Sequence, residues 1–197
     1  GNDITPLAPM LVRPRLRPVA PAAIRDALET VDWRRGRIER DDLLAFYHPE
    51  TLRRLESLRL WLADRDPDRD AAADWIRMVA LNRLSGHSPG FFSGRSMPPN
   101  QAVSVASQIK INEKLGQTPP ERDVAAIILK KTKSLLADGP PPAADFALSV
   151  GPAWDLPAVP DGSVALTVTS PPFLDIVQYA ADNWLRCWFA EIGRAHV

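Results

Sequence analysis

Four consecutive residues, Ser170, Pro171, Pro172 and Phe173, combine groups that can hold and activate a planar amine. The Ser170 hydroxyl and the Pro171 carbonyl can accept hydrogen bonds, and the Pro-Pro geometry fixes the direction of that carbonyl. The Phe173 ring offers a flat apolar face for stacking. An aromatic amine is a poor nucleophile because its lone pair is delocalised. Accepting hydrogen bonds from its N–H groups pulls the nitrogen towards tetrahedral geometry and exposes the lone pair to an electrophile.

The residues on either side predict the elements that would position this turn. Residues 163–170 and 145–150 are short and β-prone, with a turn at 160–162 between them, and residues 174–190 have mixed helical spacing. In α/β proteins, a loop that follows a strand at the carboxyl edge of a sheet is where ligands bind. We therefore expect the Ser-Pro-Pro-Phe turn to lie at such an edge.

The chain before residue 140 is dominated by helical patterns. Residues 1–19 are rich in proline and predict an extended or turn-rich connection. Helices are expected over 21–33, 48–65, 66–84, 104–116 and 118–138, with Asp66 or Asp68 and Thr118 as caps. The expected core residues are Ile24, Leu28, Val31, Leu52, Leu55, Leu58, Leu62, Trp75, Met78, Val79, Leu81, Val124, Ile127, Ile128 and Leu135. A helical block followed by strand, loop, strand, loop and helix predicts an α/β fold that is predominantly α-helical in this chain.

Composition excludes several classes of protein. The 197 residues include 24 Lys and Arg and 24 Asp and Glu, so net charge gives no indication for or against a nucleic-acid partner. The single cysteine, Cys187, rules out a disulfide framework, and His48, His87 and His196 lack metal-ligand spacing, so no metal site is expected. No apolar run reaches the length of a membrane span, so we expect no membrane partner and a cytoplasmic location.

A long loop is expected over residues 85–101, where glycine, proline and serine are concentrated. It carries Phe92, Arg95 and Asn100, which could stack on bases and contact them. Equally, Phe92 and its neighbour Phe91 could simply pin the loop onto the core. A basic trio on the helix expected at 118–138, Lys130, Lys131 and Lys133, could meet phosphate, although a solvated helical face explains it more simply.

The run "VALTVTSPPF" resembles the catalytic motif of the S-adenosylmethionine-dependent amino-methyltransferases that modify DNA on cytosine N4 or adenine N6. The Ser form is more usual in the cytosine-N4 enzymes. The flanking stretches "LPAVPDGS" and "YAADNWLRCWF" are similar to the family's loop before the catalytic strand and the helix after it. The resemblance implies catalytic roles for Ser170, Pro171, Pro172 and Phe173 on a base flipped out of the duplex, and a nucleic-acid contact for Tyr179.

A second similarity lies in "GNDITPLA", residues 1–8, which resembles the segment where a strand of the family's sheet ends in an acidic cofactor ligand. It implies that Asp3 binds the ribose hydroxyls of S-adenosylmethionine. The sequence departs from the family at Pro152, where members often have an Asp that contacts adenine, and Asp155 is a weak substitute. Ala165 also replaces a frequent Asp, and no Gly-rich cofactor loop is present.

These similarities divide the chain into four parts within a Rossmann-like methyltransferase sheet that carries a large helical insertion. Residues 1–20 are expected to be the remnant of the cofactor-binding half, 21–140 a helical insertion that reads the target sequence, and 141–190 the catalytic strand-loop-helix part. Residues 191–197 resemble translated sequencing-adapter DNA and are expected to be a non-native tail. The chain is thus expected to be a truncated fragment, inactive alone.

The implied function is methylation of an exocyclic amino group in DNA, with cytosine N4 favoured, and a restriction endonuclease is an implied partner. Two other functions stay open. The same pocket would suit an RNA base, and residues 21–138 could instead form a non-catalytic helical module that binds nucleic acid. The acceptor of a labelled methyl group, and binding by residues 21–138 alone, distinguish these alternatives.

Overall fold

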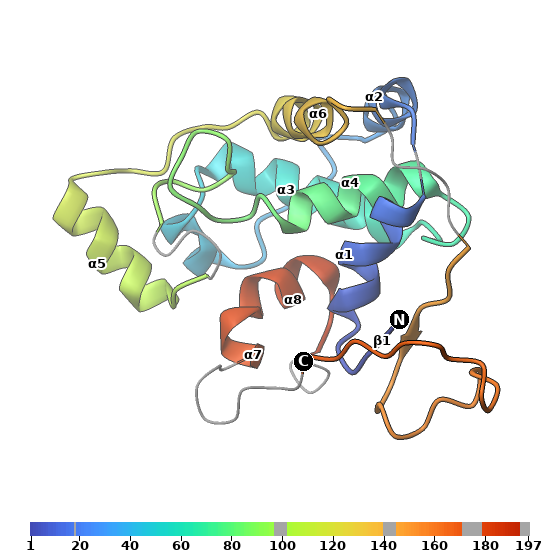
Figure 1. Cartoon of the computed structure of the whole chain (residues 1–197). Coiled ribbons are helices and arrows are strands. Elements are labelled where there is room, and N and C mark those ends of the chain that lie inside the picture. Colours follow the sequence, from blue (N-terminus) through green and yellow to red (C-terminus); the bar gives the residue numbers. More distant parts are fainter. Residues whose placement is uncertain (18, 97–101, 140–144, 171–178, 194–197) are drawn as a thin grey trace.

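The computed structural model describes residues 1–17, 19–96, 102–139, 145–170 and 179–193. Over these residues the chain is mostly helical, with a two-stranded parallel sheet at one side of the helical body (Figure 1). The elements are β1 (Asn2–Asp3), α1 (Leu7–Leu16), α2 (Pro21–Glu29), a 3-10 helix η1 (Asp41–Ala45), α3 (Pro49–Ala63), α4 (Ala71–Leu81), α5 (Val105–Leu115), α6 (Val124–Leu135), β2 (Ser149–Val150), α7 (Tyr179–Asp182) and α8 (Trp184–Ala190). The expectation of a predominantly α-helical chain is confirmed.

Helices α3 and α4 form the centre of the helical body, with α2 and α6 side by side above them (Figure 1). Helix α4 is buried on nearly all sides, as expected of an apolar helix enclosed by others. Most of the predicted core is confirmed; the buried members are Ile24, Leu28, Val31, Leu52, Leu55, Leu58, Leu62, Trp75, Met78, Val79, Leu81, Val124 and Ile128. Leu135 is 42% exposed, which corrects its prediction as a core residue, because α6 ends there and its last turn leaves the packed face.

The start of α4 differs from the prediction. Asp70 is the cap, and its Oδ1 accepts a hydrogen bond from the Ala73 amide at 2.9 Å. Asp66 instead accepts from the Asp68 amide in the preceding turn, at 2.9 Å. Each carboxylate satisfies the nearest free amides, so neither Asp66 nor Asp68 caps the helix.

The start of α6 also lies later than predicted, at Val124 with Asp123 as its cap. A proline disfavours helical backbone in the residue before it, so Pro119 and Pro120 hold Thr118 and its neighbours outside the helix. Arg122 is then fixed to α3, because its amide donates to the Thr51 hydroxyl at 2.7 Å. Side-chain contact with α3 therefore takes the place of the first helical turn that the sequence predicted.

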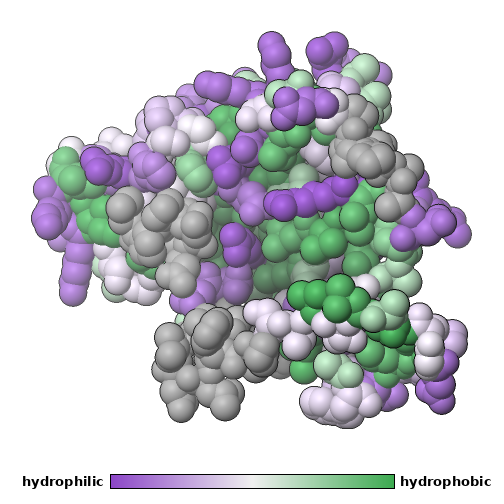
Figure 2. All heavy atoms as spheres, viewed as in Figure 1, coloured by the Kyte–Doolittle hydropathy of each residue, from purple (hydrophilic) through white to green (hydrophobic). Residues whose placement is uncertain are grey.

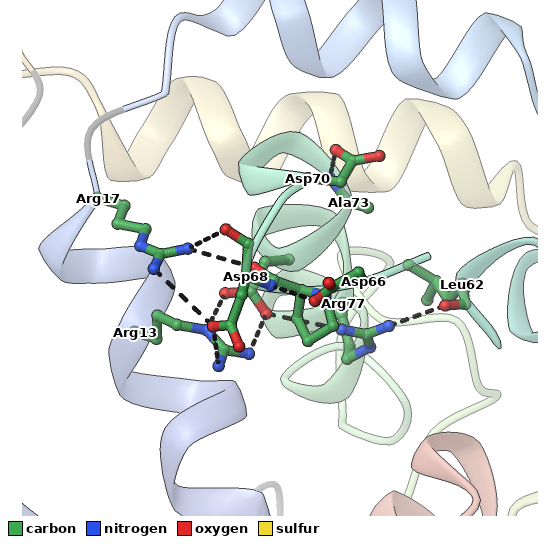
Figure 3. Close-up of polar contacts among 10 residues, drawn as sticks. Arg13, Arg17, Leu62, Asp66, Asp68, Asp70, Ala73 and Arg77 are labelled. Carbon is green, nitrogen blue, oxygen red and sulfur yellow. Dashed lines mark hydrogen bonds and ion pairs between the residues drawn. The ribbon is translucent and has the colours of Figure 1, made fainter. Parts of the chain in front are cut away.

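Residues 7–16 form a regular helix, α1, although a turn-rich connection was predicted there. Arg13 explains why the helix holds despite Pro14 in its interior. Its guanidinium donates to both carboxylate oxygens of the buried Asp74 on α4, at 2.8 and 3.2 Å, and contacts Asp68 at 3.1 Å (Figure 3). Arg77 lies 3.6 Å from the same carboxylate and donates to the Leu62 carbonyl at 2.9 Å (Figure 3). This cluster of charges binds α1 to α4.

The sheet is smaller than predicted. Residues 163–170 are exposed and form no strand with any other described residue, which corrects the prediction of a strand there. The side chains of Val164, Leu166 and Val168 are 56%, 79% and 87% exposed. A segment without a paired strand gains no ladder hydrogen bonds, so its exposed peptide groups are left to bind water. Figure 2 shows apolar side chains at the surface beside the sheet, where Figure 1 draws residues 145–170.

Among the helices that the structure describes, none combines the length and apolar character needed to cross a lipid bilayer.

Candidate functional site

The two strands bring the ends of the predicted cofactor-binding and catalytic parts together. Strands β1 and β2 pair in parallel with Asn2 opposite Ser149 and Asp3 opposite Val150. The Gly151 amide donates to the Asp3 carbonyl at 3.0 Å, and the Asn2 side chain donates to the Gly151 carbonyl at 2.9 Å. Because the strands are parallel, Asp3 and the turn that starts at Gly151 lie at the same carboxyl edge.

The Asp3 carboxylate is exposed at that edge. Its Oδ1 accepts a hydrogen bond from the Thr5 amide at 2.9 Å, which is an Asx turn leading towards α1. Within the described part of the chain, no donor contacts Oδ2. One carboxylate oxygen thus fixes the orientation of the side chain, and the other is open to a hydroxyl group of a ligand.

The other predicted cofactor and catalytic residues lie farther along the same segment. Asp155 is exposed in a turn after β2, where its amide donates to the Pro152 carbonyl at 3.3 Å. Ser170 is exposed at the end of the irregular segment 163–170. Pro171, Pro172 and Phe173 lie outside the described residues. The structure therefore brings Asp3 and the 151–155 turn to one edge, and says nothing of how Phe173 lies.

The described part of the predicted loop, residues 85–96, is folded onto the helical body. Phe92 is fully buried, which corrects its prediction as an exposed stacking residue. Its amide donates to the Arg83 carbonyl at 2.9 Å, and the Gly94 amide donates to the Phe46 carbonyl at 2.9 Å. The Phe92 ring packs in the hydrophobic core and is not available to a ligand, which agrees with the alternative that this residue pins the loop onto the core.

Arg95 keeps an exposed side chain on a fixed backbone. Its carbonyl accepts hydrogen bonds from the side-chain amides of Gln108 and Gln117 at 3.0 and 2.8 Å. Asn112 joins the same network, because its Oδ1 accepts from both of these amides and its Nδ2 donates to the Ala45 carbonyl at 2.7 Å. The Arg95 side chain is therefore exposed to solvent while hydrogen bonds hold its backbone in place. The predicted contact Asn100 lies outside the described residues.

The helix that follows the Ser-Pro-Pro-Phe turn docks beside this loop. Tyr179 begins α7, and its side chain is outside the described part. Trp184, at the start of α8, donates to the carbonyls of Ala102 and Val103 at 3.1 and 3.2 Å. Its ring packs edge-on against Phe46 at 5.7 Å. The described residues after Asn100 and those after Phe173 are thus in direct contact.

Arg83 is a candidate binding residue that the sequence did not predict. Arg83 stacks over the Phe91 ring, with 4.2 Å between the guanidinium carbon and the ring centroid. Burial lowers the pKa of Arg83, and no described carboxylate forms an ion pair with it. The signal available in the sequence was an arginine at the end of an apolar helix, eight residues before an aromatic pair, which is too common to identify a site.

Comparison of the chain with protein-family models, with curated proteins and with solved structures found no match. The functional assignment therefore depends on the residues themselves and on the geometry of the carboxyl edge.

Proposed function

We propose that this chain carries part of an S-adenosylmethionine-dependent methyltransferase that acts on an exocyclic amino group in DNA, with cytosine N4 preferred to adenine N6. The observation that supports it most is the parallel pairing of β1 with β2, 147 residues apart by the register Asn2 to Ser149. This pairing joins the two segments that resemble the family, and Asp3 and the turn after β2 share one edge. A Rossmann-like sheet is the larger architecture that we propose for it.

The residues at this edge fit the methyl donor in one respect. The open oxygen of Asp3 can accept hydrogen bonds from the vicinal hydroxyls of a ribose, as a carboxylate at a strand end does in nucleotide-binding folds. Pro152 cannot replace the carboxylate that family members often use for the adenine amino group, so Asp155 is the acidic side chain left for that role. When bound, S-adenosylmethionine supplies an electrophilic methyl group.

The chain's own residues would prepare the amine. We propose that the flipped base stacks on Phe173 while the Ser170 hydroxyl and the Pro171 carbonyl accept hydrogen bonds from its amino group. The nitrogen–carbon bond forms as the carbon–sulfur bond breaks, S-adenosylhomocysteine is released, and the new ammonium loses one proton to water. Neither a metal nor a covalent enzyme intermediate enters this scheme.

The test is transfer of tritiated methyl groups to duplex DNA by the full natural protein that contains these residues. Ser170→Ala and Phe173→Ala should each lower the rate at least about 100-fold, as expected when a positioning or acceptor group is removed. Ser163→Ala is the matched control, because Ser163 lies on the same exposed segment and its hydroxyl donates to the Pro160 carbonyl at 2.7 Å, its one hydrogen bond among the described residues. Unchanged transfer in both Ser170→Ala and Phe173→Ala would reject the proposal, and transfer to RNA alone would reassign the acceptor.

A further inference from the structure

A groove of about 430 Å³ lies between residues 83–90 and α6, and neither β1 nor β2 lines it. Its floor is apolar, with Pro89, Ala126 and Ile127 among the lining residues. Four cationic side chains also line it: Arg83, Arg122, Lys130 and Lys131. The groove is therefore a concave surface with positive charge along its length.

The two arginines are held in place without carboxylate partners of their own. Arg83 stacks on Phe91, so its guanidinium plane is already oriented. The Arg122 backbone is fixed by Thr51, and the Nε of Arg122 is buried without a hydrogen-bond partner among the described residues. Arg122, which lines the groove, therefore has no carboxylate among the described residues to offset the charge of its guanidinium, and an anion in the groove would offset it.

The two acidic residues that line the groove are engaged elsewhere. Glu121 forms an ion pair with Arg54 at 3.0 Å. Asp123 caps α6 by accepting from the Ala126 amide at 3.0 Å. Lys130 and Lys131 form no ion pair with any residue that the structure describes. The cationic side chains thus exceed the acidic ones, and the acids already have compensating partners.

The length of the groove distinguishes a polymer from a single phosphate. The lining residues on α6 extend from Ala126 to Ser134, eight residues apart, which corresponds to about 12 Å at a helical rise of about 1.5 Å per residue. A DNA strand carries one phosphate per about 3.4 Å of its axis, so several phosphates of one strand fit this span. The apolar floor between the charges suits sugar carbons.

We propose that this groove binds the sugar-phosphate backbone of DNA, with Arg122, Lys130 and Lys131 on the side of α6 and Arg83 on the side of residues 83–90. The inference deepens the proposed function, because it names a surface that would hold the methylation substrate. The proposal assigns Lys130 and Lys131 to binding phosphate, whereas the simpler alternative was that these lysines form a solvated helical face. Lys133 is not part of the proposed site, because it is exposed and does not line the groove.

The test measures binding of a fluorescent duplex oligonucleotide to the full 197-residue chain by anisotropy, over a series of salt concentrations. We compare wild type with the double variant Lys130→Gln and Lys131→Gln. Each lost phosphate contact should lower the slope of log affinity against log salt by about 0.9, so the double variant should lose about 2 in slope and at least about 10-fold in affinity at 0.1 M salt. Equal slopes in the variant and wild type would overturn the proposal.

The matched control is Lys110→Gln with Lys114→Gln, which removes two exposed lysines from α5 and changes net charge equally. A control that loses as much affinity as the groove variant would also overturn the proposal, because charge alone would then explain binding. Thermal unfolding verifies that each variant is folded. This assay needs no methyl donor, so groove-dependent binding with no methyl transfer would reject the proposed function and leave this inference standing.

Discussion

Asp74→Asn should release α1 from the helical body, because it removes the charge between two arginines. The Asp74 side chain is 1% exposed and accepts two hydrogen bonds from Arg13, whose own side chain is 14% exposed. The hydrogen bond from Arg13 to Asp74 is also the largest cause of the raised pKa of Arg13. The substitution keeps the shape of the side chain but presents an amide N–H₂ to a guanidinium.

Breaking one partner of a buried pair costs about 3–5 kcal/mol. Asparagine retains one acceptor oxygen and Arg13 still reaches water, so we expect a loss of about 2–3 kcal/mol in the free energy of unfolding. For a chain of this size about 1 kcal/mol shifts Tm by about 2–4 °C, which gives a fall of about 5–10 °C. Thermal unfolding by circular dichroism measures this, and faster amide exchange confined to residues 7–16 would locate it.

Asp68→Asn is the control for this experiment. Asp68 contacts the same arginine at 3.1 Å, but its side chain is 68% exposed, so its loss should cost less than about 1 kcal/mol. If Asp74→Asn lowers Tm no more than Asp68→Asn does, the cluster in Figure 3 does not hold α1 in place.

Three further predictions concern stability. Burial raises the pKa of Glu56, so its ionisation destabilises the fold at neutral pH, and this penalty disappears as pH falls through the raised pKa. The Tm of Glu56→Gln should therefore exceed that of wild type by more at pH 7 than at pH 5. An equal difference in Tm at the two pH values would contradict this. Phe92→Ala should cost about 3–5 kcal/mol in urea unfolding, and a loss below about 1 kcal/mol would mean that the ring is exposed. Asp123→Ala should cost about 1 kcal/mol while Thr118→Ala costs almost nothing, and the reverse order would restore the longer helix.

Local pattern predicted most helices of the body well, because their apolar residues recur at helical spacing. The spacing of leucines over α3 and the Ser104 and Gly116 boundaries of α5 needed no tertiary information; Ser104 caps the helix and Gly116 closes it with φ 56°. The predictions were wrong at positions where contacts between residues far apart in the sequence determine the local structure. Pattern could not show that Arg13 meets Asp74, 61 residues away, or that Thr51 holds Arg122 outside α6.

The candidate site shows the same division. A strand at 145–150 was predicted, but its parallel pairing with Asn2–Asp3 depends on contacts across the whole chain. The alternating residues 163–170 have the composition of a strand and lack a partner among the described residues, so composition alone could not decide their state. Phe92 reads equally well as a base-stacking or a core residue, and only its burial separates the two.

The most direct measurement of the proposed function is mass spectrometry of nucleosides from DNA incubated with S-adenosylmethionine and the full natural protein. We expect N4-methylcytosine with the wild-type protein and none with Ser170→Ala. Methylation at a ring carbon, or no methylated base in DNA while the protein binds the cofactor, would contradict it.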